Sequence, residues 1–360
     1  MQLDPRHLSY VPTLALRSSE MKGLDKLPGP TKDRLQPLFL LAPWPNALEL
    51  TKGMEKIAAA FGKRPFAIDI DRDYQAGSDG PAQASFLRLK EPTDAYANWL
   101  GFLDAYPNAS PVLQLHGAGT ADVARQISWC QETGRTFVLR VEKSRPPPDL
   151  AGIVQVLNVF GTTDFFVVLD GGWAKDVLAL EEWFTRIVGN ELEELQQDVP
   201  VVLSATSMRT SFVSIERTFL DPFSNHDLLT RMRRRFNRRT FVYGDWASTR
   251  PRTYDGGSTP LPRIDYPIKD GWLFARSKEM NWSFMDAAAA ITQSPEWIAS
   301  YPMGLWGEEM IKGAASSAAL GVNSVSSNIA ARVNIHLHLQ AFYDSGNLKG
   351  LNLDEPWEDL

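Results

Sequence analysis

The chain has 360 residues, of which 44% are hydrophobic and 22% charged, and its formal net charge at pH 7 is −6. This composition is typical of a globular protein with a large core, and the negative charge disfavours non-specific binding of nucleic acid or anionic membrane by the whole surface. The single cysteine, Cys130, excludes an intramolecular disulfide, and no multi-cysteine zinc site is indicated, so we expect a cytoplasmic protein. No apolar run is long enough to cross a bilayer, and residues 1–9 are too polar for a signal peptide.

Eight short segments are predicted to be β-strands, because their apolar residues alternate or run together between turn signals. In chain order they are Tyr10–Arg17, Pro37–Pro43, Pro65–Asp71, Pro111–His116, Arg135–Glu142, Asp164–Asp170, Val199–Ser204 and Thr240–Asp245. The helices expected between them cover about 47–61, 93–105, 120–134, 150–160, 175–196 and 227–237, with a short helix from Ser18. Strands that alternate with helices predict parallel βαβ units, and eight units favour an α/β fold of the (β/α)8 TIM-like barrel type over an open doubly wound sheet.

After the eighth strand the pattern changes. Residues 249–262 are rich in proline and glycine and predict a long loop over the rim, and 263–268 with 272–276 predict a hairpin. Further helices are expected at about 282–293, 308–320 and 327–343. We therefore divide the chain into a barrel core (1–248), a C-terminal hairpin and helical elaboration packed on it (249–345), and an acidic tail (346–360) that we expect to be solvated and mobile.

The direction of the side chains follows from the barrel itself, since strand positions that face the outer helices must be apolar. Phe137, Leu139 and Val141 then face outward, so Arg140 and Glu142 face the interior. The same rule places further polar side chains inward at or near strand C-termini, namely Arg17, Asp69, Asp71, Gln114, His116, Asp170 and Ser204. Barrel enzymes carry their active sites at this end of the strands.

The predicted mouth combines four carboxylates with two certain cations, an imbalance that protons, a divalent cation or a cationic substrate would offset. The candidate catalytic residues are Asp69, Asp71, His116, Glu142 and Asp170, and the four acidic ones are also the candidate ligands of Mg²⁺ or Mn²⁺. The candidate substrate-binding residues are Arg17, Gln114, Arg140, Ser204 and Asp245, the last at a strand end that can escape its outward register. The alternative is an arginine–carboxylate network that only closes the mouth.

The segment Arg231–Arg239 contains six arginines in nine residues. Nucleic-acid binding is one interpretation. However, the segment ends where the eighth strand begins, at the barrel face opposite the mouth, and cations at a helix C-terminus interact well with the helix dipole. We therefore favour a solvated or partner-facing patch.

Short motifs spread along the chain resemble those of the phage beta protein family. They are Tyr10-Val-Pro-Thr-Leu14, Arg17, Glu20, Pro37-Leu-Phe39, Gly244-Asp245, and Asn334, His336 and His338. The resemblance implies a role in phage–host conflict, such as antiphage defence or control of a toxic neighbour, with a possible protein partner from a neighbouring gene. It supplies no reaction. Position by position it points to Arg17, Glu20, Asp69 and Asp245, which adds Glu20 to the substrate-binding candidates.

Our leading interpretation is a TIM-like barrel in phage–host conflict that hydrolyses a phosphorylated or nucleotide-like substrate. Arg17 and Arg140 would bind its anionic oxygens and His116 would move a proton, with or without a metal ion. The alternative is a non-catalytic barrel that binds a protein partner through Arg231–Arg239 or the C-terminal helices.

Overall fold

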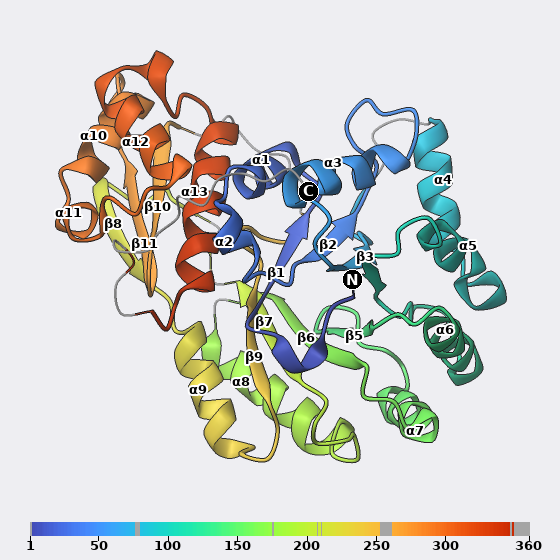
Figure 1. The fold of residues 1–360 in the computed structure, drawn as a ribbon. Helices are drawn as coiled ribbons and strands as arrows, with labels where there is room; N and C mark the ends of the chain where they lie inside the picture. The colour runs from blue at the N-terminus through green and yellow to red at the C-terminus, as the bar shows by residue number, and fades with distance from the viewer. Residues whose placement is uncertain are drawn as a thin grey trace.

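A ring of eight parallel strands forms the centre of the molecule. The computed structural model describes residues 2–75, 80–174, 176–206, 208–209, 211–252, 261–345 and 348. The strands are β1 (Tyr10–Ala15), β2 (Leu38–Leu41), β3 (Phe66–Ile70), β4 (Ala109–Pro111), β5 (Phe137–Glu142), β6 (Phe165–Trp173), β7 (Val201–Thr206) and β9 (Phe241–Asp245). Their order is β4-β3-β2-β1-β9-β7-β6-β5, and a parallel bridge between Val112 and Val138 joins the two ends of that order (Figure 1). The predicted TIM-like α/β barrel is confirmed.

Helices cover the outside of this ring (Figure 1). They are α1 (Ser18–Asp25), α2 (Gly29–Lys32), α3 (Thr51–Phe61), α4 (Pro81–Leu89), α5 (Thr93–Leu103), α6 (Thr120–Glu132), α7 (Leu150–Phe160), α8 (Val177–Arg186) with the π-helical turn η2 (Ile187–Glu191), and α9 (Asn225–Arg235). Local signals set their ends. Before α7, for example, Asp149 accepts a 2.8 Å hydrogen bond from the Gly152 amide, and Gly161 ends the helix at φ 61°.

The strands bury both faces, as parallel strands of a barrel do. Phe137, Leu139 and Val141 pack with the helices in the outer core, whereas Val138 lies in a second core inside the ring. The N-terminal segment contributes Leu3 to the inner core, where its carbonyl accepts a 2.7 Å hydrogen bond from Thr136. The alternation predicted for the side chains of β5 is therefore confirmed.

Two predictions within the barrel were wrong. The fourth strand is Ala109–Pro111 and not Pro111–His116, although the amides of Val112 and Leu113 still donate to Ile68 and Val138. Beyond them the Gln114 amide donates to the side chain of Gln126, which ends the ladder. No helix was expected between 61 and 93, but Pro81–Leu89 form α4, while residues 76–79 lie outside the described part of the chain.

A second, antiparallel sheet lies beside the barrel (Figure 1). It consists of β10 (Arg263–Ile268), β11 (Gly271–Arg276) and β8 (Arg217–Pro222), in that order, which confirms the predicted hairpin and adds a strand that the sequence did not reveal. Around it are α10 (Phe284–Thr292), α11 (Pro295–Ser300), α12 (Trp306–Ser316), the 3-10 turn η3 (Ala318–Leu320) and α13 (Val325–Ala341). Helix α13 contacts both α1 of the barrel and β10 of the second sheet.

The division of the chain at 248 stays a prediction. Strand β8 precedes that position, so the second sheet takes strands from both sides of it. Most of the predicted rim loop (residues 253–260) and all of the predicted acidic tail except Leu348 lie outside the described residues.

Candidate functional site at the barrel mouth

Arg140, the inward residue near the end of β5, is the centre of the polar mouth. Its Nη1 donates to Asp69 at 2.8 Å and its Nη2 to Asp170 at 2.6 Å, and Nη2 also lies 3.3 Å from Glu142. The arginine, Asp69 and Asp170 are buried, and Glu142 is mostly so. Three predicted site carboxylates from β3, β5 and β6 therefore meet at one guanidinium, as the inward register required.

The amide of Gln114 extends this network toward β4. It donates to Asp69 at 2.7 Å and accepts a hydrogen bond of the same length from Arg72. The same Nη2 of Arg72 also donates to the hydroxyl of Tyr96. Tyr96 is the last of three consecutive residues in α5 with φ between 52° and 64°, a left-handed turn that costs non-glycine residues about 1–2 kcal/mol each. This strained turn places Tyr96 at the mouth.

Arg145, three residues beyond β5, closes the other side. Two of its nitrogens contact the Glu142 carboxylate, at 2.7 and 3.2 Å, and Nη1 contacts Asp73 at 2.5 Å. Between these groups and the end of β4 lies a cavity of about 380 Å³. Its lining is Asp69, Arg72, Val112–Gly117, Arg140, Glu142 and Arg145–Pro148. The side chain of His116, predicted to face in, is exposed at this cavity.

The segment that follows β9 crosses the rest of the mouth. The indole of Trp246 donates to Asp170 at 2.9 Å, and Arg252 donates to Asp71 at 2.6 Å. Ala247 and Ser248 between them have φ of 46° and 67°, so this crossing is also strained. The mouth is thus covered on the β1 and β6 side and open on the β3–β5 side.

Three of the remaining candidates lie near this rim but outside the cavity lining. Arg17 contacts Glu20 at 3.0 Å, and the other oxygen of Glu20 accepts from the Ala15 amide. Glu20 is fully buried, which raises the pKa of its carboxyl even though Arg17 opposes the shift. Ser204 faces inward as predicted, but its hydroxyl is buried and without a partner among the described residues.

Asp245 lies elsewhere. It keeps the outward register of β9 and accepts hydrogen bonds of 2.6 Å from Tyr10 and from His336 of α13. The expectation that it escapes to the mouth is wrong, because the aromatic hydroxyls of Tyr10 and Tyr243 and the imidazole of α13 fix it on the outer face. His336 likewise contacts the barrel wall and not the mouth.

The expected excess of negative charge is also wrong. Arg72, Arg145 and Arg252 were missing from the count, and each contacts a group of the mouth. Arg72 and Arg145 come shortly after strands, and Arg252 lies in the segment that crosses the rim. In such segments the alternation rule does not predict which way a side chain points. The signal that could have found Arg72 and Arg145 is the mixed charge of Asp71-Arg-Asp73 and of Glu142-Lys-Ser-Arg145 at two strand ends.

The electrostatics agree with a paired network. Burial would raise the pKa of Glu142, but Arg140 and Arg145 outweigh it and hold that pKa below its ordinary value. At Asp71 burial dominates, and the pKa is raised although Arg252 opposes the shift. The pKa of Arg140 lies well above its ordinary value, because its carboxylate partners outweigh the effect of burial.

These residues do not fit a divalent cation. Such ions take several carboxylate, carbonyl or water oxygens, whereas each predicted ligand, Asp69, Asp71, Glu142 and Asp170, here faces an arginine. In the described part of the chain no group of three or more His, Cys, Asp or Glu residues is placed to hold a metal ion. The Mg²⁺ or Mn²⁺ ion therefore stays a prediction that the donor set does not favour.

Comparison with known proteins adds the family. The family model described as "Beta protein" matches residues 10–342. This chain belongs to the beta protein family. It is similar to "Protein beta" of Enterobacteria phage P4, with 26% identity over 372 residues that cover 100% of both chains. The resemblance noted in the short motifs is confirmed, and the four positions it pointed to divide between the rim (Arg17, Glu20, Asp69) and the outer wall (Asp245) of this beta protein family member.

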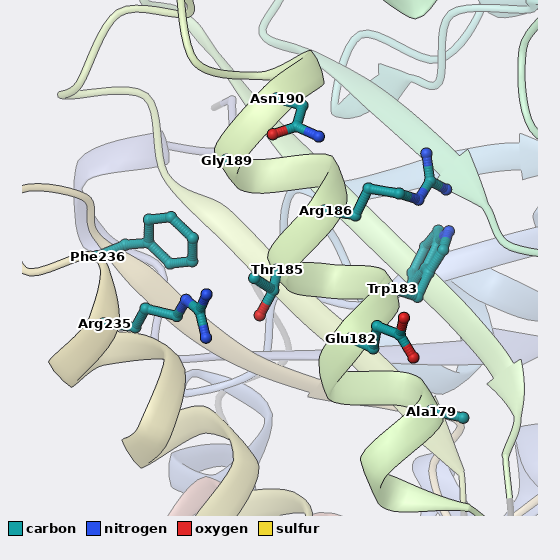
Figure 2. Close-up of a pocket in the computed structure, with 9 residues that line it drawn as sticks. All are labelled: Ala179, Glu182, Trp183, Thr185, Arg186, Gly189, Asn190, Arg235 and Phe236. Atoms are coloured by element: carbon teal, nitrogen blue, oxygen red, sulfur yellow. The ribbon is translucent and has the colours of Figure 1, made fainter.

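The arginine-rich segment of this family member ends where β9 begins. Half of its arginines stabilise the fold: Arg231 contacts Glu181 at 2.8 Å, Arg233 donates to the Phe241 carbonyl, and Arg239 donates to carbonyls after η2. Arg235 and Phe236 instead face Thr185 of α8 across an open groove of about 560 Å³ (Figure 2). None of the described helices is both long and apolar enough to cross a bilayer.

Proposed function

We propose that this protein acts in phage–host conflict and that its barrel mouth binds a small phosphorylated or nucleotide-like ligand. The conflict role is supported by membership of the beta protein family and by similarity to a phage protein over the whole chain. The observation that carries the ligand is the cavity on the β3–β5 side of the mouth. Its volume lies in the range of small-molecule sites.

The lining suits a ligand with an anionic and an apolar part. Arg72, Arg140 and Arg145 provide cationic groups, and Nε and Nη1 of Arg72 have no hydrogen-bond partner among the described residues. Guanidinium groups bind phosphoryl oxygens through paired hydrogen bonds. Leu113 and the prolines 146–148 provide an apolar wall against which a base or sugar ring can pack.

Hydrolysis is the reaction that we propose for this site. His116 is the exposed titratable side chain of the cavity lining that no described residue binds, and it would protonate the leaving oxygen when water displaces it from phosphorus. Arg72 and Arg145 would stabilise the charge on the phosphoryl oxygens. No step in this scheme requires a metal ion.

Calorimetry with a panel of nucleoside mono- and diphosphates, with and without Mn²⁺, tests the proposal. We expect saturable binding that Arg72→Gln weakens at least tenfold with folding intact, whereas Arg186→Gln on the exposed surface of α8 leaves it unchanged. His116→Ala should keep binding and lose hydrolysis. Absence of binding throughout the panel would reject the ligand site, and turnover only with Mn²⁺ would reject the metal-free scheme.

The groove between α8 and α9 supports a second candidate, a non-catalytic barrel that binds a protein partner. Arg234 and Arg235 are exposed, and Arg235 lies beside the aromatic ring of Phe236, a combination common at protein interfaces. Arg234→Glu together with Arg235→Glu should then abolish co-purification with a neighbouring-gene product, while Arg88→Glu on exposed α4 should not. If the double variant loses function in cells and Arg72→Gln keeps it, this candidate replaces the first.

A further inference from the structure

A cluster of arginines lies where the barrel meets the second sheet, apart from the mouth cavity. Its members come from four separate segments: Arg17 follows β1, Arg250 follows β9, Arg263 begins β10, and Arg332 is in the middle of α13. Arg17 donates two hydrogen bonds, of 3.3 and 3.4 Å, to the backbone carbonyl of Arg250. The side chain of Arg332 is only 6% exposed, and that of Arg263 18%.

The carboxylates at this junction are fewer than the arginines. Asp265 of β10 is fully buried and contacts both Arg263 and Arg332, and Glu20 contacts Arg17. Four guanidinium groups thus share two carboxylates among the described residues. The segment 253–260 lies outside the described structure, and its sequence contains one acidic residue, so it could offset at most one of the two remaining charges.

One arginine of this cluster carries an unsatisfied donor. Nε of Arg332 is buried and has no hydrogen-bond partner among the described residues, although Nη1 of the same guanidinium contacts Asp265. A buried charged donor without an acceptor destabilises the folded state. Such a donor in a native protein calls for an acceptor outside the described residues, and a bound anion is one that would serve.

The sheet register adds to the positive charge. Arg263 pairs across the ladder with Arg276, and Arg276 pairs with Arg217, so three arginines form one row, of which Arg217 also contacts Glu279 at 3.4 Å. Like charges directly opposite one another destabilise a sheet. The row is at the end of the sheet where β10 begins, beside the partners of Asp265.

Repulsion between the arginines also lowers the pKa of two of them, Arg250 and Arg332. Burial lowers the pKa of Arg250, and the neighbouring Arg263 and Arg17 lower it further. The pKa of Arg332 is likewise lowered by burial, with Arg263 and Arg250 adding to the effect that Asp265 opposes. Arg263 therefore lowers the pKa of both Arg250 and Arg332, as expected within one cluster.

We propose that this junction binds a phosphate-type dianion through Arg17, Arg250, Arg263 and Arg332. Two negative charges would balance the two uncompensated guanidinium groups, and an oxygen of the anion would accept from Nε of Arg332. Arginine is suited to this task because its planar donors match the geometry of phosphoryl oxygens. The bound anion would link the barrel to α13 and β10, so that binding stabilises the contact between the two sheets.

Thermal unfolding and calorimetry of the full chain with inorganic phosphate, against chloride at matched ionic strength, test the site. We expect a saturable rise in Tm and a Kd that Arg250→Gln weakens at least tenfold, with partial rescue in Arg250→Lys. Arg250 is half-buried and makes no ion pair with a described residue, so this variant should fold. Without phosphate, Arg250→Gln should melt at or above the wild-type temperature, because it removes repulsion.

A parallel titration with AMP separates two sources of the anion. Binding of inorganic phosphate supports a site for the free ion, whereas a response to AMP alone supports a subsite for the phosphoryl group of a larger ligand. Because AMP can also bind at the mouth, both titrations are repeated in the Arg72→Gln background, where the response must persist and Arg250→Gln must still weaken it. If the response follows Arg72 instead, or if neither anion raises Tm beyond the effect of chloride, the junction site is rejected, and in the first case the mouth proposal still stands.

Discussion

Asp245 of β9 accepts a 2.6 Å hydrogen bond from Nε2 of His336 in α13, across the interface between the barrel wall and the C-terminal helices. Both residues are buried, and the hydroxyl of Tyr10 donates to the other carboxylate oxygen. This buried hydrogen bond links the barrel to the C-terminal helices, because neither the carboxylate nor the imidazole can bond to water instead.

We expect Asp245→Asn to lower the free energy of unfolding by about 3 kcal/mol at pH 7, the range for breaking a buried pair. Burial raises the pKa of Asp245, but His336, Tyr10 and the Ala247 amide outweigh it and lower the pKa below its ordinary value. The ionised Asp245 carboxylate therefore stabilises the fold at pH values above its pKa in the unfolded chain. This stabilisation is lost as the pH falls through the lower pKa that Asp245 has in the folded protein. Urea unfolding from pH 7 to 3 measures it, and Tyr10→Phe, losing one hydrogen bond, should cost only about 1 kcal/mol. Equal losses at all pH values would contradict the charge pairing.

Arg140→Met tests the centre of the mouth. The variant leaves Asp69, Asp170 and Glu142 without their shared cation, so we expect a loss of about 4 kcal/mol at pH 7. The loss should shrink as the pH falls, since protonated carboxyls do not require a positive partner. Lys52→Met, which breaks an exposed pair on α3, serves as the control and should change stability by less than about 0.5 kcal/mol. A loss that does not depend on pH would indicate that packing, not charge, is what Arg140 contributes.

Glu308 at the start of α12 should oppose folding at neutral pH. Its Oε2 accepts from the Met303 amide, but its Oε1 is buried without a partner among the described residues. Burial raises its pKa from 4.5 to about 7. The folded protein then holds a proton that the unfolded chain releases, so stability falls as the pH rises from about 4.5 to 7.

Glu308→Gln should therefore gain about 2 kcal/mol above pH 7 and flatten the fall in stability over that window. Guanidinium unfolding at pH 5 and pH 8 provides the measurement, and the exposed Glu309→Gln is the matched control. An unchanged pH dependence in Glu308→Gln would show that the carboxyl is already ionised in the folded state.

A close helix contact gives a further prediction. A Cβ on Gly23 of α1 would lie 2.7 Å from the Ala330 carbonyl of α13, too near for any real contact. Gly23→Ala should separate the two helices and cost about 1–3 kcal/mol. Gly101→Ala on α5, where nothing lies within 4 Å of the added atom, should instead stabilise by about 0.5–1 kcal/mol. Thermal melts of both variants compare the two, and equal effects would mean that α1 shifts without cost.

The barrel was predictable because apolar side chains alternate along its strands and mark which face is turned toward the helices. Phe66, Ile68 and Ile70 mark the outer face of β3, and the same alternation marks β5, so strands, direction and inward residues followed from spacing alone. Strand β8 was missed for the opposite reason. It is an edge strand with exposed side chains, including Phe219 and Leu220, and its sequence carries no such alternation of buried and exposed positions.

The candidate site was predictable only in part. The inward residues Asp69, Arg140 and Asp170 meet as expected. Arg145 and Arg252, which pair with Glu142 and Asp71, lie instead in loops, where no backbone periodicity fixes the direction of a side chain. The position of Asp245 depends on His336 of α13, which is 91 residues further along the chain. No local sequence pattern encodes how that helix packs on the barrel.

Strand β8 has a consequence for any shortened form of the chain. A fragment that stops after β9 would retain this strand but lose β11, its partner along all six residues. Six unpaired backbone positions beside Phe219 and Leu220 would then face solvent, a template on which further copies can add. The excised barrel should therefore precipitate, and solubility would be recovered only by removing residues 217–222 as well.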